Sequence, residues 1–387
     1  MTIGTTYPPE LTTYTDSQTG RRVTQLTNSN AKDYHLYFYN PTVTPDNQYL
    51  IFISERTGIS NLFRLDLNTG EIVQLTDAAP ARADYFPFTY TPIHGVSACL
   101  PAIGAHEVFY FVGNTLFGVN YETLATRPLL QLPPDRRPSM LNADASGTTL
   151  VFATWDEARF AEWERRMVAS EVRSDDQTFQ QTTSTIIRYD TTTEQCDEIL
   201  RLDHFWINHV LLHPTNRDLI LFCHEYSSQP DRMWLLDAST GEYAPIPGQD
   251  ADEWYEHEFW SKDGTRVCFH GGVENDKTIG FCGWYNITTN QSEKFYHCTP
   301  GRTYAHYNLS PDGKTMLTDG EGKPGCISQV HLQNNAQKFE PLCRHDSYKY
   351  DDDQRCHPHP SFTPDGTQVI FTSNRTGTSN IYLTDWS

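Results

Sequence analysis

The sequence predicts an all-β protein, a seven-bladed β-propeller that occupies residues 1–387 as a single domain. Three observations support this. A strand-rich segment recurs at intervals of roughly 40 to 50 residues, the spacing of propeller blades. Each copy alternates short apolar runs with turn residues, as a four-stranded unit requires. The 23 glycines and 23 prolines suit a chain with many tight turns.

The two clearest copies occupy residues 42–77 and 360–387. Both contain a P-D-N or P-D-G turn, an apolar strand, an R-T-G loop, an S-N pair and another strand. The last copy ends without a fourth strand. The N-terminal segment G-R-R-V-T-Q-L-T, residues 20–27, matches the fourth strand G-E-I-V-Q-L-T of the first copy. We therefore expect residues 20–27 to complete the last blade and close the ring, which removes exposed sheet edges.

Weaker copies complete the expected ring. With them, the blades begin near residues 40, 97, 140, 209, 257, 306 and 359. Residues 154–182 break the pattern, because they are rich in Glu, Ala, Arg and Met. This composition predicts a helical insertion in blade three. The insertion is either a solvated flap or a lid over the functional site.

Composition and charge exclude several classes of protein. The net charge of −20 argues against a nucleic acid or an anionic membrane as partner. The chain has no apolar run of about 18 residues and no signal-peptide pattern at its start. Its nine cysteines are scattered, with no C-x-x-C pair. We therefore expect reduced thiols and a cytoplasmic location.

The repeat also supplies a register in which blades can be compared. Seven residues before the turn glycine, or its equivalent, the chain has Asn40, Ser97, Met140, His209, His257, His306 and His359. Histidine fills four of these positions although only 15 of the 387 residues are histidine. The position starts the innermost strand, which lines the central channel of a propeller. We expect the four imidazoles to meet at one mouth of this channel; the alternative is that they only cap strand ends.

The stretch Q-R-C-H-P-H-P, residues 354–360, extends this group. Residues i and i+2 of an extended strand point to the same side, so His357 and His359 present both rings together. Gln354 can add an amide oxygen, and His306 comes from the preceding blade. Three imidazoles and an oxygen suit a divalent ion such as Mn²⁺, Zn²⁺ or Ni²⁺.

His257 and His209 lie on the adjacent arc of the predicted ring. The segment C-H-E-Y-S-S-Q-P-D-R-M, residues 223–233, is a loop that brings Arg232 to the same mouth. A metal ion, free imidazoles and a guanidinium around one cleft suit the binding and activation of a carboxylate.

Several motifs resemble those of the oligogalacturonate lyases, polysaccharide lyases with a seven-bladed propeller fold. They are H-V-L-L-H-P, C-H-E, D-R-M-W-L, H-E-F-W and H-P-H-P-S-F-T-P-D-G, and they cover the chain best from about residue 205 onward. The resemblance implies a Mn²⁺-dependent β-elimination on short α-1,4-linked oligogalacturonides, with 4,5-unsaturated uronate products. It implies a base, His257, and a residue that assists at the substrate carboxylate, Arg232. The metal ligands that it implies are His306, Gln354, His357 and His359.

Other functions remain open at this point. His209 could bind substrate or assist the base. The chain could be a lyase of the same mechanism that acts on a different uronate or on longer pectate. It could also be a non-catalytic binding propeller. A propeller attached to a serine hydrolase is disfavoured, because the sequence contains no G-x-S-x-G motif.

Overall fold

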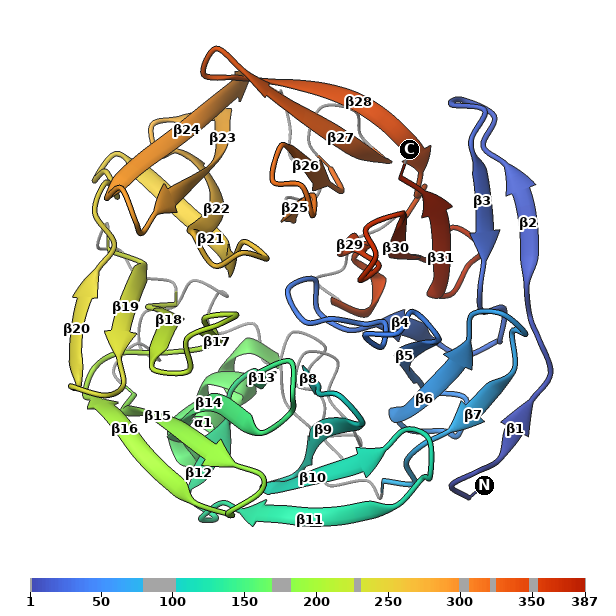
Figure 1. Cartoon of the computed structure of the whole chain (residues 1–387), viewed down its shortest axis with the longest axis horizontal. Coiled ribbons are helices and arrows are strands. Elements are labelled where there is room, and N and C mark those ends of the chain that lie inside the picture. The colour runs from blue at the N-terminus through green and yellow to red at the C-terminus, as the bar shows by residue number, and fades with distance from the viewer. Residues whose placement is uncertain are drawn as a thin grey trace.

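The computed structural model describes residues 2–78, 102–168, 182–225, 231–298, 306–320, 325–347 and 354–386. Its antiparallel sheets are arranged radially around a central axis, as Figure 1 shows. The all-β propeller prediction is therefore confirmed. No helix in this described part of the chain is long and apolar enough to cross a membrane.

The first sheet belongs to the N-terminal part of the chain. It consists, from its outer edge inward, of β1 (Thr6–Tyr7), β7 (Ile72–Gln74), β6 (Asn61–Asp66), β5 (Tyr49–Ser54) and β4 (Asp33–His35). The second sheet is a four-stranded meander. It consists of β8 (Ala102–Ile103), β9 (Glu107–Val112), β10 (Thr115–Asn120) and β11 (Thr126–Gln131). The predicted blade start at Ser97 lies outside the described residues.

The third and fourth sheets follow in chain order. The third contains β12 (Arg136–Pro138), β13 (Asn142–Ala143), β14 (Thr149–Asp156), β15 (Ser184–Asp190) and β16 (Cys196–Leu202). The fourth contains β17 (Val210–Leu212), β18 (Leu219–Cys223), β19 (Met233–Asp237) and β20 (Glu242–Pro245). The inner strands β13 and β17 lie near the axis (Figure 1).

One sheet combines two units that the sequence predicts as separate blades. Its first half is β21 (Glu253–Trp260), β22 (Arg266–Val273), β23 (Asp276–Asn286) and β24 (Gln291–Cys298). Its second half is β25 (Tyr307–Leu309), β26 (Thr315–Thr318), β27 (Cys326–Gln333) and β28 (Ala336–Arg344). A single parallel bridge, Tyr296 to Ala336, joins the halves. The described strands thus form six hydrogen-bonded sheets. Seven blades result only if this eight-stranded sheet is counted as two, so the count of seven stays a prediction.

The last sheet closes the ring. Its inner strands are β29 (Ser361–Phe362), β30 (Gln368–Ser373) and β31 (Asn380–Asp385). The N-terminal strand β3 (Arg22–Gln25) pairs with β31, with Val23 opposite Thr384. The predicted closure by residues 20–27 is therefore confirmed. A further strand, β2 (Thr12–Thr15), adds outside β3 and was not predicted.

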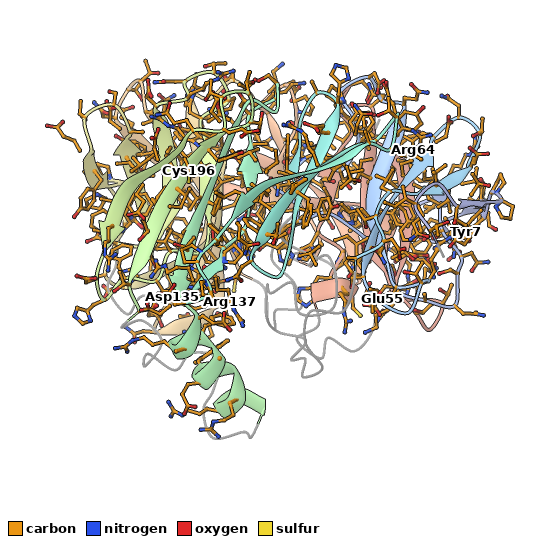
Figure 2. The ribbon with its side chains drawn as sticks, turned by 90° about the horizontal axis from the view of Figure 1, so that it is seen from below. Tyr7, Glu55, Arg64, Asp135, Arg137 and Cys196 are labelled. Atoms are coloured by element: carbon orange, nitrogen blue, oxygen red, sulfur yellow. The ribbon has the colours of Figure 1, made fainter. Side chains whose placement is uncertain are left out.

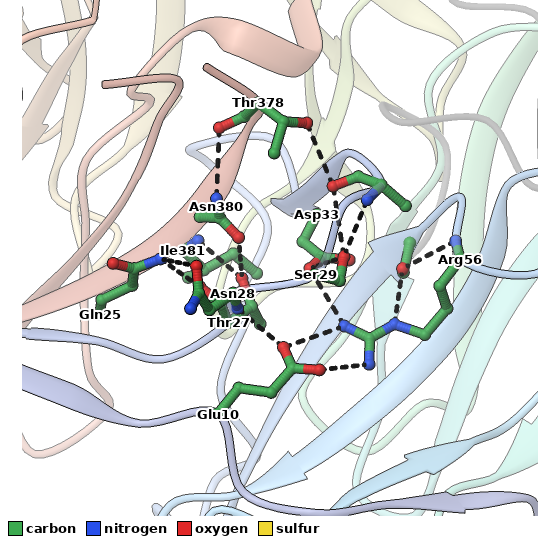
Figure 3. A network of polar contacts seen from close by, with 12 residues as sticks. Glu10, Gln25, Thr27, Asn28, Ser29, Asp33, Arg56, Thr378, Asn380 and Ile381 are labelled. Carbon is green, nitrogen blue, oxygen red and sulfur yellow. Dashed lines mark hydrogen bonds and ion pairs between the residues drawn. The ribbon is translucent and has the colours of Figure 1, made fainter. Parts of the chain in front are cut away.

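A polar network reinforces this closure, as Figure 3 shows. Arg56 donates to Glu10 at 3.1 Å and to the buried Asp33 at 3.0 Å. Glu10 also accepts the backbone N–H of Asn28 at 2.7 Å. The Thr27 hydroxyl contacts Asn380 of the last sheet at 3.3 Å. The N-terminal segment is thus bonded to the first and the last sheets together.

The recurring S/T-P-D-G turns have a common geometry. In each, the hydroxyl of the first residue donates to the aspartate two positions later, as Ser310 does to Asp312 at 2.7 Å. The fourth position has a positive φ, +70° at Gly313, which glycine adopts without strain. The first copy has Asn47 there, at φ +58°. Asparagine is tolerated in this left-handed region, so the turn survives the substitution.

Inner strands are interrupted near the register position. In the first sheet, β4 begins at Asp33, earlier than the predicted start near residue 40. A turn, in which Asn40 N–H donates to Tyr37 O at 2.8 Å, then separates β4 from a bridge between Val43 and Leu50. The chain between them reaches toward the axis (Figure 1).

The helix α1 (Glu157–Val168) lies between β14 and β15, within the predicted insertion 154–182. Residues 169–181 lie outside the described residues. Glu157 is in its first turn and Arg165 in its last, as the helix dipole favours. Figure 2 shows α1 projecting from the side of the disc on which Glu55 lies. Glu55 pairs with Arg355 at 2.7 Å, so α1 and the histidine-rich stretch share one face.

Candidate metal centre and active site

The four histidines of the register surround one tyrosine ring. Tyr37, which follows β4, is 2% exposed. Its ring centroid lies 4.9 Å from that of His359 and 6.0 Å from that of His209. The corresponding distances are 6.2 Å to His306 and 6.4 Å to His257. The structure therefore brings all four imidazoles together around one buried aromatic residue of the first sheet.

Two of the other register positions, Asn40 and Met140, have packing roles. Asn40 donates to Leu141 O at 3.0 Å and accepts from Asn142 at 3.0 Å, which links the first sheet to the third. Met140 accepts a hydrogen bond from the Tyr39 hydroxyl.

Three imidazoles converge in a possible metal site. The ligand nitrogens of His306, His357 and His359 lie within 4.8 Å of one another. Among the described residues, the buried Nε2 of His359 has no hydrogen-bond partner. Burial lowers the pKa of His359 and brings that of His306 to about 3, so both rings are neutral near pH 7. The side chain of Gln354, the predicted oxygen ligand, lies outside the described residues.

These residues fit a borderline divalent ion. A neutral imidazole binds a metal through the lone pair of its unprotonated nitrogen. A buried ring nitrogen with no hydrogen-bond donor beside it has such a lone pair available. His306 Nδ1 lies 2.8 Å from Asp319 Oδ2, which directs its other nitrogen away from the carboxylate. Three such nitrogens suit Mn²⁺ or a similar cation.

His257 lies beside this triad in an unusual backbone conformation. It has φ +55° and falls in an irregularity of β21, between Glu256 and Phe259. Its ring centroid is 4.5 Å from that of His306. Its Nδ1 lies 2.6 Å from His270 Nε2 on β22. The bulge thus turns the His257 ring toward the triad, and His270 fixes its orientation.

Arg232 and His209 belong to a buried network of charges. Arg232 donates from Nε to Glu258 at 2.9 Å and from Nη1 to Glu225 at 3.0 Å. Glu258 also bonds to His209 Nδ1 at 2.6 Å. Burial alone would raise the pKa of both carboxyl groups, but the Arg232 guanidinium and His209 outweigh it and lower the pKa of each. The guanidinium is therefore held by two carboxylates.

Two further groups of ligand-type atoms have internal explanations. Glu256, His257 and His270 meet the same distance limit as the triad, as do His209, Cys223 and Glu258. In the first, His257 is bonded to His270, and in the second, Glu258 is bonded to both His209 and Arg232. Only the triad combines convergence with a buried nitrogen that has no hydrogen-bond partner among the described residues.

A comparison with known families identifies the chain. The sequence model of the oligogalacturonate lyase family matches residues 1–387. The chain belongs to this family. It is therefore a polysaccharide lyase, and the resemblance stated from its motifs is confirmed. The non-catalytic alternative is set aside.

Individual relatives of this lyase match over nearly the whole chain. An oligogalacturonide lyase of Pectobacterium atrosepticum is 25% identical over 99% of this chain and 98% of its own. An oligogalacturonate lyase of Dickeya dadantii is 24% identical, with coverage of 96% and 95%. A solved oligogalacturonate lyase in complex with manganese is 25% identical, has a TM-score of 0.83, and matches 100% of this chain and 98% of that one. The oligogalacturonate lyase of Vibrio parahaemolyticus has the same TM-score at 24% identity, with coverage of 100% and 99%.

Sequence reasoning missed Tyr37, His270, Asp319 and Glu258. A signal existed for two of them. His270 and Asp319 each follow a register histidine, His257 or His306, by 13 positions, and each bonds to it. Tyr37 stands in the aromatic run L-Y-F-Y-N before Asn40, but nothing in that run shows which ring enters the channel.

Proposed function

We propose that this lyase cleaves short α-1,4-linked oligogalacturonides by β-elimination and uses Mn²⁺ or another divalent ion. The observation that carries the proposal is the convergent triad of imidazoles, of which His306 and His359 are buried and neutral, beside the bonded pair His257 and His270. His306, His357 and His359 would hold the ion, with Gln354 as the fourth ligand. The names of the relatives and the manganese in one solved relative support this choice.

The reaction must remove a very weakly acidic proton. The C5–H of a uronate lies next to a carboxylate that is already negative, so its removal builds up charge. A divalent cation at the triad, when bound, supplies positive charge that stabilises this developing anion.

His257 would accept the C5 proton. A neutral imidazole can accept at Nε2 only when its Nδ1 carries the hydrogen. His270 Nε2, 2.6 Å away, is placed to accept the hydrogen bond from that Nδ1–H. As the proton leaves C5, the bond between C4 and the glycosidic oxygen breaks, the departing oxygen takes up a proton to become a hydroxyl group, and a 4,5-unsaturated uronate results. No water is consumed, in contrast to hydrolysis with two carboxylates.

Arg232 and His209 would serve the substrate side of the site. A role for Arg232 at the substrate carboxylate requires an exchange of contacts, because its Nε and Nη1 donate to Glu258 and Glu225. We propose that the substrate carboxylate enters this network. Such an exchange would also affect His209, because His209 Nδ1 is bonded to Glu258 at 2.6 Å.

The proposal is tested by measuring product formation with defined substrates. The protein is freed of metal with a chelator, supplied with MnCl₂ and mixed with digalacturonate. The expected result is metal-dependent ultraviolet absorbance from the conjugated double bond. A parallel series uses polygalacturonate and an oligomer of another uronate.

The outcomes separate the proposal from its alternative. Absorbance that rises fastest with digalacturonate supports the proposed substrate. A rise only with polygalacturonate or the other uronate favours the alternative lyase. No rise with any of them, with metal present from neutral to alkaline pH, contradicts the proposal.

We also propose a cytoplasmic location. It is supported by the cysteines of the described residues, which are all free thiols, and most of which are buried. Reduced thiols are typical of cytoplasmic proteins.

A further inference from the structure

We propose that Asp319 and His35 form a clamp that presets the imidazoles of His306 and His359 for metal binding. Neither residue is a ligand; both act through the ligands as positioning residues. The inference rests on the proposed metal site, and it goes beyond it by naming what holds that site in shape.

Asp319 binds two of the three ligand residues at once. It follows β26 and is 0% exposed. Its Oδ2 lies 2.8 Å from His306 Nδ1, and its Oδ1 accepts the backbone N–H of His306 at 3.0 Å. Its Oδ2 also accepts the backbone N–H of His359 at 3.3 Å. One carboxylate therefore ties the starts of β25 and β29, which belong to different sheets.

The first of these bonds sets the tautomer of His306. A carboxylate accepts, so the hydrogen of the neutral ring lies on Nδ1 and the lone pair lies on Nε2. The same bond limits rotation of the ring, and the backbone bond fixes the position of its Cα. Nε2 thus stays available to the other two imidazoles.

His35 holds the opposite side of the His359 residue. It lies on β4 and is 3% exposed. Its Nε2 lies 2.7 Å from His359 O, and its Nδ1 lies 2.7 Å from the Thr372 hydroxyl. Because a carbonyl oxygen only accepts, Nε2 carries the hydrogen and Nδ1 accepts from Thr372. His359 is therefore bonded at its N–H by Asp319 and at its C=O by His35.

The clamp has a clear physical purpose at His359. This residue has φ +44°, a left-handed conformation that costs energy for most residues with a Cβ. Such a conformation persists only where the surroundings hold it. Without the clamp, the backbone would relax and carry Nε2 away from the triad. Loss of partners that orient metal ligands typically weakens metal affinity by about 10- to 100-fold.

The test is a calorimetric titration of the full chain with MnCl₂ alone, at fixed neutral pH. In Asp319→Asn, an amide NH₂ replaces one of the two acceptor oxygens. It then faces an N–H donor of His306 or His359, with which it cannot form a hydrogen bond. We expect its dissociation constant to rise by about 10- to 100-fold over that of the wild type. The matched control is Asp16→Asn. Asp16 is also buried, at 2% exposed, and accepts the backbone N–H groups of Thr19 and Arg344 at 2.8 and 3.0 Å. Its variant should bind Mn²⁺ as the wild type does.

A second variant keeps the inference testable if Asp319→Asn does not fold, which circular dichroism would reveal. His35→Phe keeps a ring of similar size but removes the donor to His359 O, and we expect it to weaken Mn²⁺ binding in the same direction. Wild-type affinity in both folded variants, or in His35→Phe alone if the other is unfolded, overturns the clamp and leaves the proposed function intact. A wild-type protein that binds no Mn²⁺ overturns the metal site itself and the clamp with it.

Discussion

At the scale of single residues, the site is built from pairs 13 positions apart. His257 bonds to His270, and His306 bonds to Asp319. The spacing follows from the repeat, because the second strand of each unit runs back past the start of the first. A comparison of one register position finds the histidines. It misses their partners, because the partner position has a different residue type in each blade.

The role of His270 is testable by substitution. His270→Phe keeps the buried ring but removes the nitrogen that bonds to Nδ1 of His257, the proposed base. We expect turnover of digalacturonate to fall by about 100-fold, the cost of a misplaced group. Mn²⁺ affinity should stay unchanged, and the pH–rate profile should shift.

Two variants complete that comparison. His270→Gln places an acceptor oxygen near the position of Nε2 and should retain more activity than His270→Phe. His331→Phe alters a half-exposed histidine on the outer part of its sheet and should have no effect. Equal activity in His270→Phe and wild type would show that the pair has no catalytic purpose.

At the scale of elements, a buried ion network joins the loop after β18 to strand β21. Glu258 is 0% exposed and bonds to both Arg232 and His209. Glu258→Gln removes one of the two carboxylates that neutralise the buried Arg232 guanidinium. Glu225 then remains as the single charged partner of Arg232 in this network. We expect the free energy of unfolding at neutral pH to fall by about 3 to 5 kcal/mol.

This loss should depend on pH with a defined sign. The pKa of Glu258 is lowered in the folded protein from an ordinary value of 4.5. Its contribution to stability is therefore complete above pH 4.5 and is lost as the pH falls toward the folded pKa. Urea unfolding of variant and wild type should differ most near pH 7 and converge in acid.

The control for this prediction is an exposed ion pair. Glu274 lies 2.9 Å from Lys277 on the surface, so Glu274→Gln should change the unfolding free energy by less than about 0.5 kcal/mol. An equal loss in both variants, or a pH-independent difference for Glu258→Gln, would contradict the network's role.

The helix α1 shows how far sequence patterns define an element. Its composition predicted a helix within residues 154–182, and α1 occupies Glu157–Val168. The aromatic partners of its buried side, Trp155 and Trp206, come from other segments, and a local pattern cannot reveal them. The lid interpretation stays a prediction, since residues 169–181 lie outside the described chain.

At the scale of the whole molecule, the repeat predicted the propeller and its closure because both depend on matching strands. Residues 20–27 matched a fourth strand, and β3 pairs with β31 as expected. The strand β2 was missed, because T-T-Y-T carries no apolar pattern of its own. The bridge between β24 and β28 was also missed, since it depends on how two long outer strands meet.

In the proposed mechanism, neighbouring blades of the ring have different roles. The triad combines His306 with the two histidines that precede β29, while the proposed base projects from β21 of the preceding unit. Closure of the ring places Tyr37 of the first sheet among these elements. Metal binding and proton transfer would thus belong to different units of the ring.

The most direct test measures Mn²⁺ affinity and elimination rate on the same preparation of His257→Ala, with His359→Ala as its counterpart. We predict that His257→Ala binds Mn²⁺ as the wild type does but cleaves digalacturonate about 10² to 10⁴ times more slowly. His359→Ala should lose Mn²⁺ binding and activity together. Loss of the metal in His257→Ala, or wild-type turnover in that variant, would contradict the separate roles proposed for His257 and His359.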